Sequence, residues 1–200
     1  MKIVLYIVLI CLVIFIISQI YIVLTSKKSQ TQAYKVLVQD DNIEIRFYPS
    51  VTTASITSGA KTYNELGNGG FRTLANYIFG GNKTNQQISM TAPVHMEISK
   101  DISKMSFVMP ADMNLDNLPK PIDSSIHLKN TTSENVASIR FCGFITEKNI
   151  KTNTELLKKY LKANSIEYFG NFSVLGYNPP YQFVDRRNEI IVSIRYISNY

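Results

Sequence analysis

The chain has 200 residues and a formal net charge of +6, from 21 Lys and Arg against 15 Asp and Glu. This length suits one domain with an appendage. The charges are scattered in pairs such as Lys158–Lys159 rather than gathered in a stripe, which argues against a nucleic-acid interface. The two cysteines, one of them (Cys11) inside an apolar run, exclude a disulfide framework and a cysteine-based zinc site.

The appendage is the apolar run from Ile3 to Leu24. At about 1.5 Å per residue it would extend about 33 Å as a helix, enough to cross a hydrocarbon core of about 30 Å. It is longer than the apolar region of a signal peptide, so we expect an uncleaved, single-pass membrane anchor. Lys2 on one side nearly balances Lys27 and Lys28 on the other, so the sequence leaves open which side carries the domain. We assign residues 1–24 to the anchor, 25–33 to a polar linker and 34–200 to the domain.

The first half of the domain begins with an alternating strand at residues 43–47 and a further short strand. Thr62 and Glu65 fit a capping box at the start of a helix. Phe71, Leu74, Ala75 and Ile78 then fall on one helical face, and two glycines at 80–81 provide the stop. Strands are expected at about 87–98 and 104–109.

The second half repeats this order after a proline-rich crossing at 109–121. It has a strand at 137–141, a capping box at 152–155, and strands at about 171–183 and 189–196. Pro93 and the Pro179–Pro180 pair fall at matching places, each expected to break a strand. We therefore predict an α+β fold: two βαββ-type repeats forming a distorted antiparallel β-barrel or saddle, with two helices packed outside.

The sequence offers no readable reaction centre. We find neither a nucleophile–base pair nor a constellation of convergent carboxylates, so no catalytic residue and no metal ligand is predicted. His95, His127 and Met90 are side chains of types that can hold heme iron. His95, in a strand region, faces either a cleft or solvent; His127 is expected at the surface and Met90 in the core.

Four segments carry a resemblance to a known family. They are residues 71–82 (Phe-Arg-x-Leu-x-x-Tyr-Ile-Phe-Gly-x-Asn), 88–94 (Ile-Ser-Met-Thr-Ala-Pro-Val), 176–180 (Gly-Tyr-Asn-Pro-Pro) and 187–190 (Arg-Asn-Glu-Ile). In this order and spacing they resemble the SOUL/HEBP heme-binding protein family over roughly residues 34–196. The resemblance implies two βαββ-type repeats in a twisted barrel. It also implies non-enzymatic, noncovalent binding of heme or another tetrapyrrole in an apolar cleft beside the first helix.

The resemblance also implies which residues form the site. Apolar side chains of the first helix would meet the porphyrin face, an aromatic would lie across the cleft, and arginines would pair with its carboxylates. Asn76 and Gln182 stand where members can carry basic residues, and Phe47 where some carry a histidine. We therefore expect heme without a firm axial ligand. The expected binding residues are Phe71, Arg72, Ala75, Ile78, Tyr177, Arg186 and Arg187.

Several alternatives stay open on the residues alone. The helical stripe that contains Phe71 is typical of core packing as well as of a cleft wall. The segment around Arg187 equally fits a structural turn in which Glu189 pairs with an arginine. For the whole domain, the alternatives are a binding module for other amphiphiles or for protein partners, and a hydrolase that uses a buried glutamate.

Overall fold

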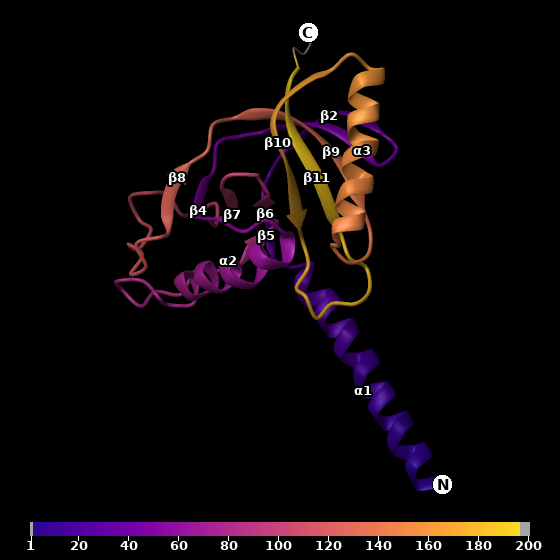
Figure 1. The fold of residues 1–200 in the computed structure, drawn as a ribbon. Coiled ribbons are helices and arrows are strands. Elements are labelled where there is room, and N and C mark those ends of the chain that lie inside the picture. Colours follow the sequence, from indigo (N-terminus) through magenta and orange to yellow (C-terminus); the bar gives the residue numbers. More distant parts are fainter. Residues whose placement is uncertain (1, 197–200) are drawn as a thin grey trace.

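The computed structural model describes residues 2–196 and shows three helices and one large antiparallel sheet (Figure 1). The helices are α1 (Lys2–Ser26), α2 (Tyr63–Ile78) and α3 (Glu147–Ala163). The strands are β1 (Gln30–Thr31), β2 (Lys35–Asp40), β3 (Ile43–Tyr48), β4 (Thr52–Ser58), β5 (Thr91–Ala92), β6 (Val94–Glu97), β7 (Ser103–Val108), β8 (His127–Asn130), β9 (Glu134–Phe141), β10 (Glu167–Gly176) and β11 (Asn188–Arg195). The α+β class is therefore confirmed.

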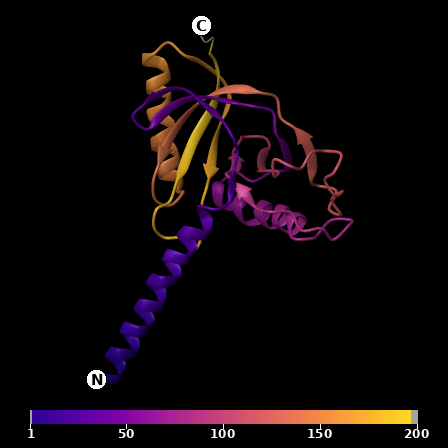
Figure 2. The same cartoon turned by 180° about the vertical axis from the view of Figure 1, so that it is seen from behind.

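The large sheet has nine strands in the order β2-β3-β9-β11-β10-β6-β7-β4-β8. It is not closed: within residues 2–196, β2 and β8 are its two edges and do not pair with each other. The predicted barrel is wrong in this respect, although the sheet is curved (Figure 2). Closure depends on pairing between strands far apart in the sequence, which a local pattern of alternation does not encode.

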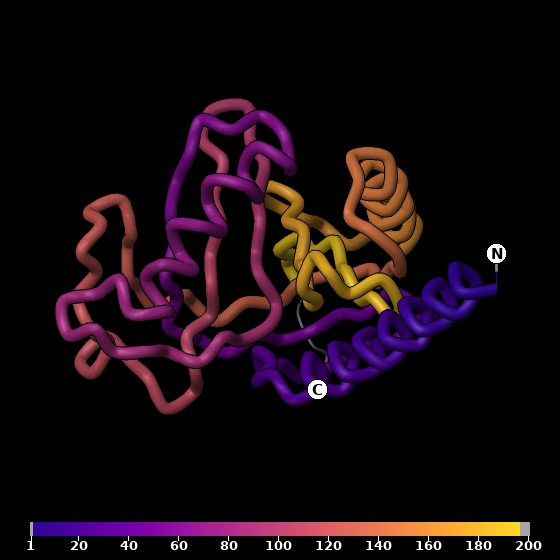
Figure 3. Tube along the Cα trace, turned by 90° about the horizontal axis from the view of Figure 1, so that it is seen from below, coloured from indigo at the N-terminus to yellow at the C-terminus, as the bar shows by residue number. Residues whose placement is uncertain are grey.

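The register gives the sheet one apolar face, against which both α2 and α3 pack. Met96 pairs with Met105 and Val174, and Val174 with Ile190, so these buried side chains share a face. Gly70 of α2 lies so close to this face that a Cβ atom would be 2.9 Å from Ile56 Cδ1. The view from below shows the two helices beside separate halves of the curved sheet (Figure 3). The neighbouring positions of each strand point to the opposite face.

The halves of the sheet meet where β6 pairs with β10. Each of these strands follows a helix, in the orders β4-α2-β6-β7 and β9-α3-β10-β11, with the short β5 just before β6. The strands at 43–47 and 137–141, which the sequence suggested as counterparts, are direct neighbours in the sheet, with Ile45 opposite Ala137. In addition, β9 leads into α3 without an intervening strand. The internal duplication stays a prediction.

The helix starts agree with the sequence in one case and not in the other. The Thr62 side chain caps α2 by accepting from the Glu65 backbone N–H at 3.3 Å, as predicted. The box at 152–155 was a wrong prediction, because α3 begins at Glu147. There the Thr146 side chain accepts from the Asn149 N–H at 3.2 Å, so the true cap lies well over one turn before Thr152.

The structure agrees with the predicted position of one proline break and not with that of the other. Pro93 lies between β5 and β6, as a strand break should. Pro179 and Pro180 were predicted inside a strand, but β10 ends at Gly176 and these residues lie in the loop that leads to β11. We call residues 177–187 the 177–187 loop. It lies at the end of the domain from which α1 projects (Figure 1).

The segment next to α1 is ordered against the domain. Within residues 25–33, expected as a polar linker, β1 pairs in parallel with β5. The backbone N–H of Gln32 continues this contact by donating to the Ala92 carbonyl at 2.8 Å. The chain therefore passes from the apolar helix into a separate two-stranded sheet, formed by β1 and β5, within a few residues of Ser26.

Candidate functional site

A cleft of about 800 Å³ opens between α2 and the 177–187 loop. Phe71, Ala75 and Arg72 of α2 form one wall, and Met96 and Met105 of the apolar sheet face form the floor. The facing wall comes from the segment before α3 and from the 177–187 loop; it consists of Phe144, Ile145, Gly176, Asn178, Pro180 and Arg186. A volume in this range suits a small organic ligand or cofactor.

The aromatic side chains keep this cleft open. Phe71 packs edge-on against Phe107 of β7, with ring centroids 5.4 Å apart, and still exposes 38% of its surface. On the other wall, the Arg186 guanidinium lies 4.6 Å from the centre of the Phe144 ring. At Gly67, on the cleft side of α2, a Cβ atom would meet no other atom within 4 Å, so space remains above the floor.

Two polar groups of the cleft residues lack partners within residues 2–196. The Tyr63 hydroxyl and the Arg186 Nε are both buried without a hydrogen bond. Burial raises the pKa of Tyr63 well above its ordinary value, so its hydroxyl stays protonated and can donate. Arg72 adds an exposed guanidinium at the same wall. An exposed guanidinium on an apolar wall fits a ligand that carries carboxylates on an apolar body.

The sequence-predicted residues divide between the two faces of the sheet. Phe71, Arg72, Ala75 and Arg186 come together in the cleft. Ile78 lies in the core with 1% of its surface exposed, and it does not line the cleft. Tyr177 and Arg187 also lie outside the cleft, in a polar network on the opposite face.

This network is centred on Glu189 of β11, whose side chain is fully buried. Arg46 donates to both of its carboxylate oxygens, at 2.6 and 3.0 Å, and Arg187 Nη2 donates at 2.6 Å. The Tyr177 hydroxyl donates at 2.9 Å. Burial raises the pKa of Glu189, but the two guanidinium groups outweigh it, and the pKa lies below its ordinary value. The structural turn that the sequence left open is thus present.

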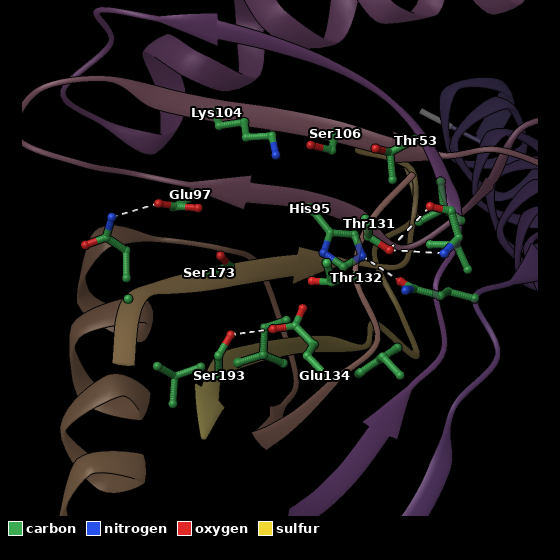
Figure 4. Close-up of a pocket in the computed structure, with 18 of the residues that line it drawn as sticks. Thr53, His95, Glu97, Lys104, Ser106, Thr131, Thr132, Glu134, Ser173 and Ser193 are labelled. Carbon is green, nitrogen blue, oxygen red and sulfur yellow. Dashed lines mark hydrogen bonds between the residues drawn. The ribbon is translucent and has the colours of Figure 1, made fainter. Parts of the chain in front are cut away.

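A second, polar cavity of about 350 Å³ lies on the same face as this network (Figure 4). His95 and Lys104 lie on one side of it, and Glu134 lies on the other, where it accepts from the Ser193 hydroxyl at 2.5 Å. His95 Nε2 lies 2.7 Å from Gln32 Oε1. Burial, together with the charge of Lys104, lowers the pKa of His95 to about 4. This histidine therefore faces a cavity, but not the cleft beside α2.

Sequence reasoning missed three residues that shape these sites. Tyr63 lies inside the capping box formed by Thr62 and Glu65, a motif that predicts the start of a helix and says nothing of a cleft, yet its side chain is buried and lines the cleft. Phe144 lies in a segment with no periodic signal, just before α3. Arg46 alternates with apolar neighbours in β3, a pattern that usually indicates a solvent-facing residue. Its side chain is nevertheless buried, with only 2% of its surface exposed.

Comparison with known proteins now gives the class of the chain. The family model described as SOUL heme-binding protein matches residues 29–193. The chain therefore belongs to the SOUL heme-binding protein family. It is 24% identical to Heme-binding protein 2 of Homo sapiens over 76% of this chain and 78% of that protein. It is 25% identical to Heme-binding protein 1 of Xenopus tropicalis over 74% of this chain and 80% of that protein.

Solved structures with the same fold differ widely in sequence. A hydrolase from Listeria innocua superposes with a TM-score of 0.57 at 6% identity, over 80% of this chain and 94% of that one. The C-terminal domain of EcmrR gives a TM-score of 0.56 at 9% identity, over 82% and 99%. At these identities the likeness concerns the fold alone.

Proposed function

We propose that this chain binds heme or a related tetrapyrrole, noncovalently, in the cleft between α2 and the 177–187 loop. The observation that carries the proposal is the combination of an apolar cleft of about 800 Å³ with two arginines, Arg72 and Arg186, on its opposite walls. A planar macrocycle buries apolar area on both sides, at about 25 cal/mol per Å². Its carboxylates would pair with the arginines.

The cleft residues favour binding without strong axial ligation. Among residues 2–196, neither a histidine nor a cysteine lines the cleft. The thioethers of Met96 and Met105 lie in its floor, where they pair across β6 and β7 and are 8% and 1% exposed. Bound heme would supply a flat aromatic surface and a redox-active iron. The chain's part is to hold that surface between Phe71 and Arg186 and to shield it from water.

We also propose that α1 anchors the domain in a membrane. The helix is 25 residues long, and its apolar side chains are exposed along most of its length. Retention of α1 in the mature protein is part of this proposal, because a signal sequence has a similar composition. The side of the membrane that carries the domain is left open.

Hydrolysis in the cleft is not part of the proposal. No Asp or Glu lines the cleft within the described chain. The buried Glu189 lies on the other face, and its pKa is lowered, the opposite of what a carboxyl acting as a general acid needs.

Titration of hemin into the full chain in detergent micelles tests the binding proposal, with the Soret band as the readout. We expect a saturable shift of the band at one hemin per chain, beyond that given by empty micelles. An absorbance that merely follows empty micelles would contradict the proposal.

A further inference from the structure

The 177–187 loop contacts the last turns of α1. Gln19 of α1 binds the loop through its side chain. Its Nε2 donates to the Tyr181 carbonyl at 3.2 Å, and its Oε1 accepts from the Phe183 N–H at 3.0 Å. Phe183 also packs against Phe15, with ring centroids 6.0 Å apart. About two turns beyond, the Ser26 hydroxyl donates to the Gln182 side chain at 2.8 Å. The loop therefore runs alongside α1 from Ser26 back to Phe15.

This contact sets the depth of the loop relative to a membrane. Phe15 lies about 13 Å below Leu24 along the helix axis, at about 1.5 Å per residue. If the loop stayed in water, only the helix from Lys2 to Ile14 could lie in lipid, a length of about 20 Å. A hydrocarbon core is about 30 Å thick, so that remnant would be too short to span it. A spanning α1 carries the loop into the lipid.

The outward side chains of the loop suit such a position. Tyr181, Phe183 and Val184 are 59%, 54% and 54% exposed, although all three are large and apolar or amphipathic. From residue 177 to residue 184 the loop has no charged residue. The first charge, Asp185, pairs with Lys27 at 2.8 Å. This order, aromatic side chains followed by a charged pair, is typical of a membrane–water interface.

Several backbone groups of the loop have hydrogen-bond partners in the loop itself or in α1, so these groups do not depend on water. Arg186 Nη1 donates to the carbonyls of Pro179 and Gln182, at 2.8 and 2.6 Å. The side-chain Nε2 of Gln182 donates to the carbonyls of Val184 and Asp185, at 2.9 and 3.1 Å. The Gln19 side chain of α1 donates to the Tyr181 carbonyl and accepts from the Phe183 N–H. These contacts reduce the number of backbone groups that would lose water at the membrane surface.

We propose that the 177–187 loop inserts Tyr181, Phe183 and Val184 into the lipid leaflet on the domain side of the membrane. The partner is the bilayer itself, and the inference rests on the proposed retention of α1 as a membrane helix. Because Asn178, Pro180 and Arg186 of the same loop form a wall of the cleft, that wall lies at the membrane surface. An apolar ligand dissolved in the leaflet can then reach the cleft without crossing water.

The chain contains no tryptophan, so single Trp substitutions report on chosen positions without background. The full chain is reconstituted in phosphatidylcholine vesicles, with or without bromine on the acyl chains. Phe183→Trp reports on the loop, with Tyr181→Trp as a second reporter in case the first variant folds poorly. Phe169→Trp is the matched control, because Phe169 is 50% exposed at the other end of β10. Tyr6→Trp reports on α1 alone.

We expect the loop reporters to emit at shorter wavelength and to be quenched by brominated lipid, as the Tyr6→Trp reporter is, while Phe169→Trp is not quenched. Quenching at Tyr6→Trp without quenching in the loop would overturn the insertion while leaving the anchor intact. Absence of quenching at Tyr6→Trp would overturn both. A blue shift in the loop that disappears on dilution and resists brominated lipid would show a second copy of the chain on this surface, against the proposal.

Discussion

Arg46 of β3 and Glu189 of β11 form a bidentate ion pair on the polar face of the sheet, with N–O distances of 2.6 and 3.0 Å. Their side chains are 2% and 0% exposed. The two strands are not neighbours, since β9 lies between them. The pair therefore spans three strands, and a second guanidinium, that of Arg187, joins it at 2.6 Å. The 187–190 motif is thus part of a structural network.

Removal of the Glu189 charge should destabilise the fold strongly. In Glu189→Gln the buried Arg46 guanidinium keeps only the partly buried Glu44 carboxylate, 2.6 Å from its Nε, as a counter-charge. Removing one partner of a buried ion pair costs about 3–5 kcal/mol in other proteins. We expect a decrease of that order in the free energy of unfolding, measured by denaturant titration of the full chain in micelles. Arg195→Gln, which removes an exposed pair at 3.5 Å, is the control and should change little. Equal losses in the two variants would contradict a buried network.

His95 should make stability depend on pH in a defined window. Its pKa is about 4 in the folded chain against 6.5 ordinarily, so only the unfolded chain takes up a proton between these values. Stability therefore falls as the pH drops from about 6.5 to about 4, by on the order of 2 kcal/mol between pH 7 and pH 5. The charged or titratable groups around His95 include Lys104, Glu97 and Glu134. Unfolding curves at pH 7 and pH 5 measure the loss.

His95→Gln provides the comparison, because it removes the titrating group and keeps a donor for Gln32. We expect its stability to change less between pH 7 and pH 5 than that of the unaltered chain. Glu189 acts at lower pH: its depressed pKa stabilises the fold above the ordinary range of a carboxyl, and this contribution is lost as the pH falls through the folded value. The same pH response in His95→Gln and the unaltered chain would refute the assignment.

Tyr177 should matter for stability and not for ligand binding. Its hydroxyl donates to the Glu189 carboxylate at 2.9 Å, on the face away from the cleft. Hydrogen bonds to charged groups contribute about 1.5–3 kcal/mol, so we expect Tyr177→Phe to lose an amount in that range. Its hemin affinity should stay that of the unaltered chain. A large loss of hemin affinity in a stably folded Tyr177→Phe variant would show instead that Tyr177 contacts the ligand.

Ala75→Trp should block the cleft. Ala75 lies in the α2 wall, and an indole there would occupy the space proposed for the ligand. We expect at least about a tenfold weaker hemin affinity, which corresponds to about 1.4 kcal/mol. Thr73→Trp, on the same helix but outside the cleft, is the matched control and should bind as the unaltered chain does. Circular dichroism checks that both variants fold, and equal affinities would place the ligand elsewhere.

The sequence predicted those parts of the fold that local patterns decide. The apolar run sets α1, and the Thr62 cap with the periodic face of Leu74 and Ile78 sets α2. The start of α3 was missed because Thr152 and Glu155 match a capping box inside the helix, while the true cap at Thr146 lacks a Glu three residues on. The open edges at β2 and β8 follow from long-range pairing, which no local pattern records.

The sequence also predicted only part of the site, namely the part that a local pattern determines. Phe71 and Ala75 follow from one helical face, and both line the cleft. Arg186 and Arg187 looked equivalent in the sequence, but successive side chains of an extended segment point to opposite sides. Arg186 therefore lies in the cleft wall, whereas Arg187 joins Glu189. The same alternation separates Asn178, in the cleft, from Tyr177.

The position of the heme iron tests the central proposal most directly. Crystals of the chain grown with hemin would give an anomalous scattering peak at the iron. We predict that peak in the cleft, between Phe71 of α2 and Arg186 of the 177–187 loop. A peak on the polar face of the sheet, beside His95 or Tyr177, would contradict the proposal.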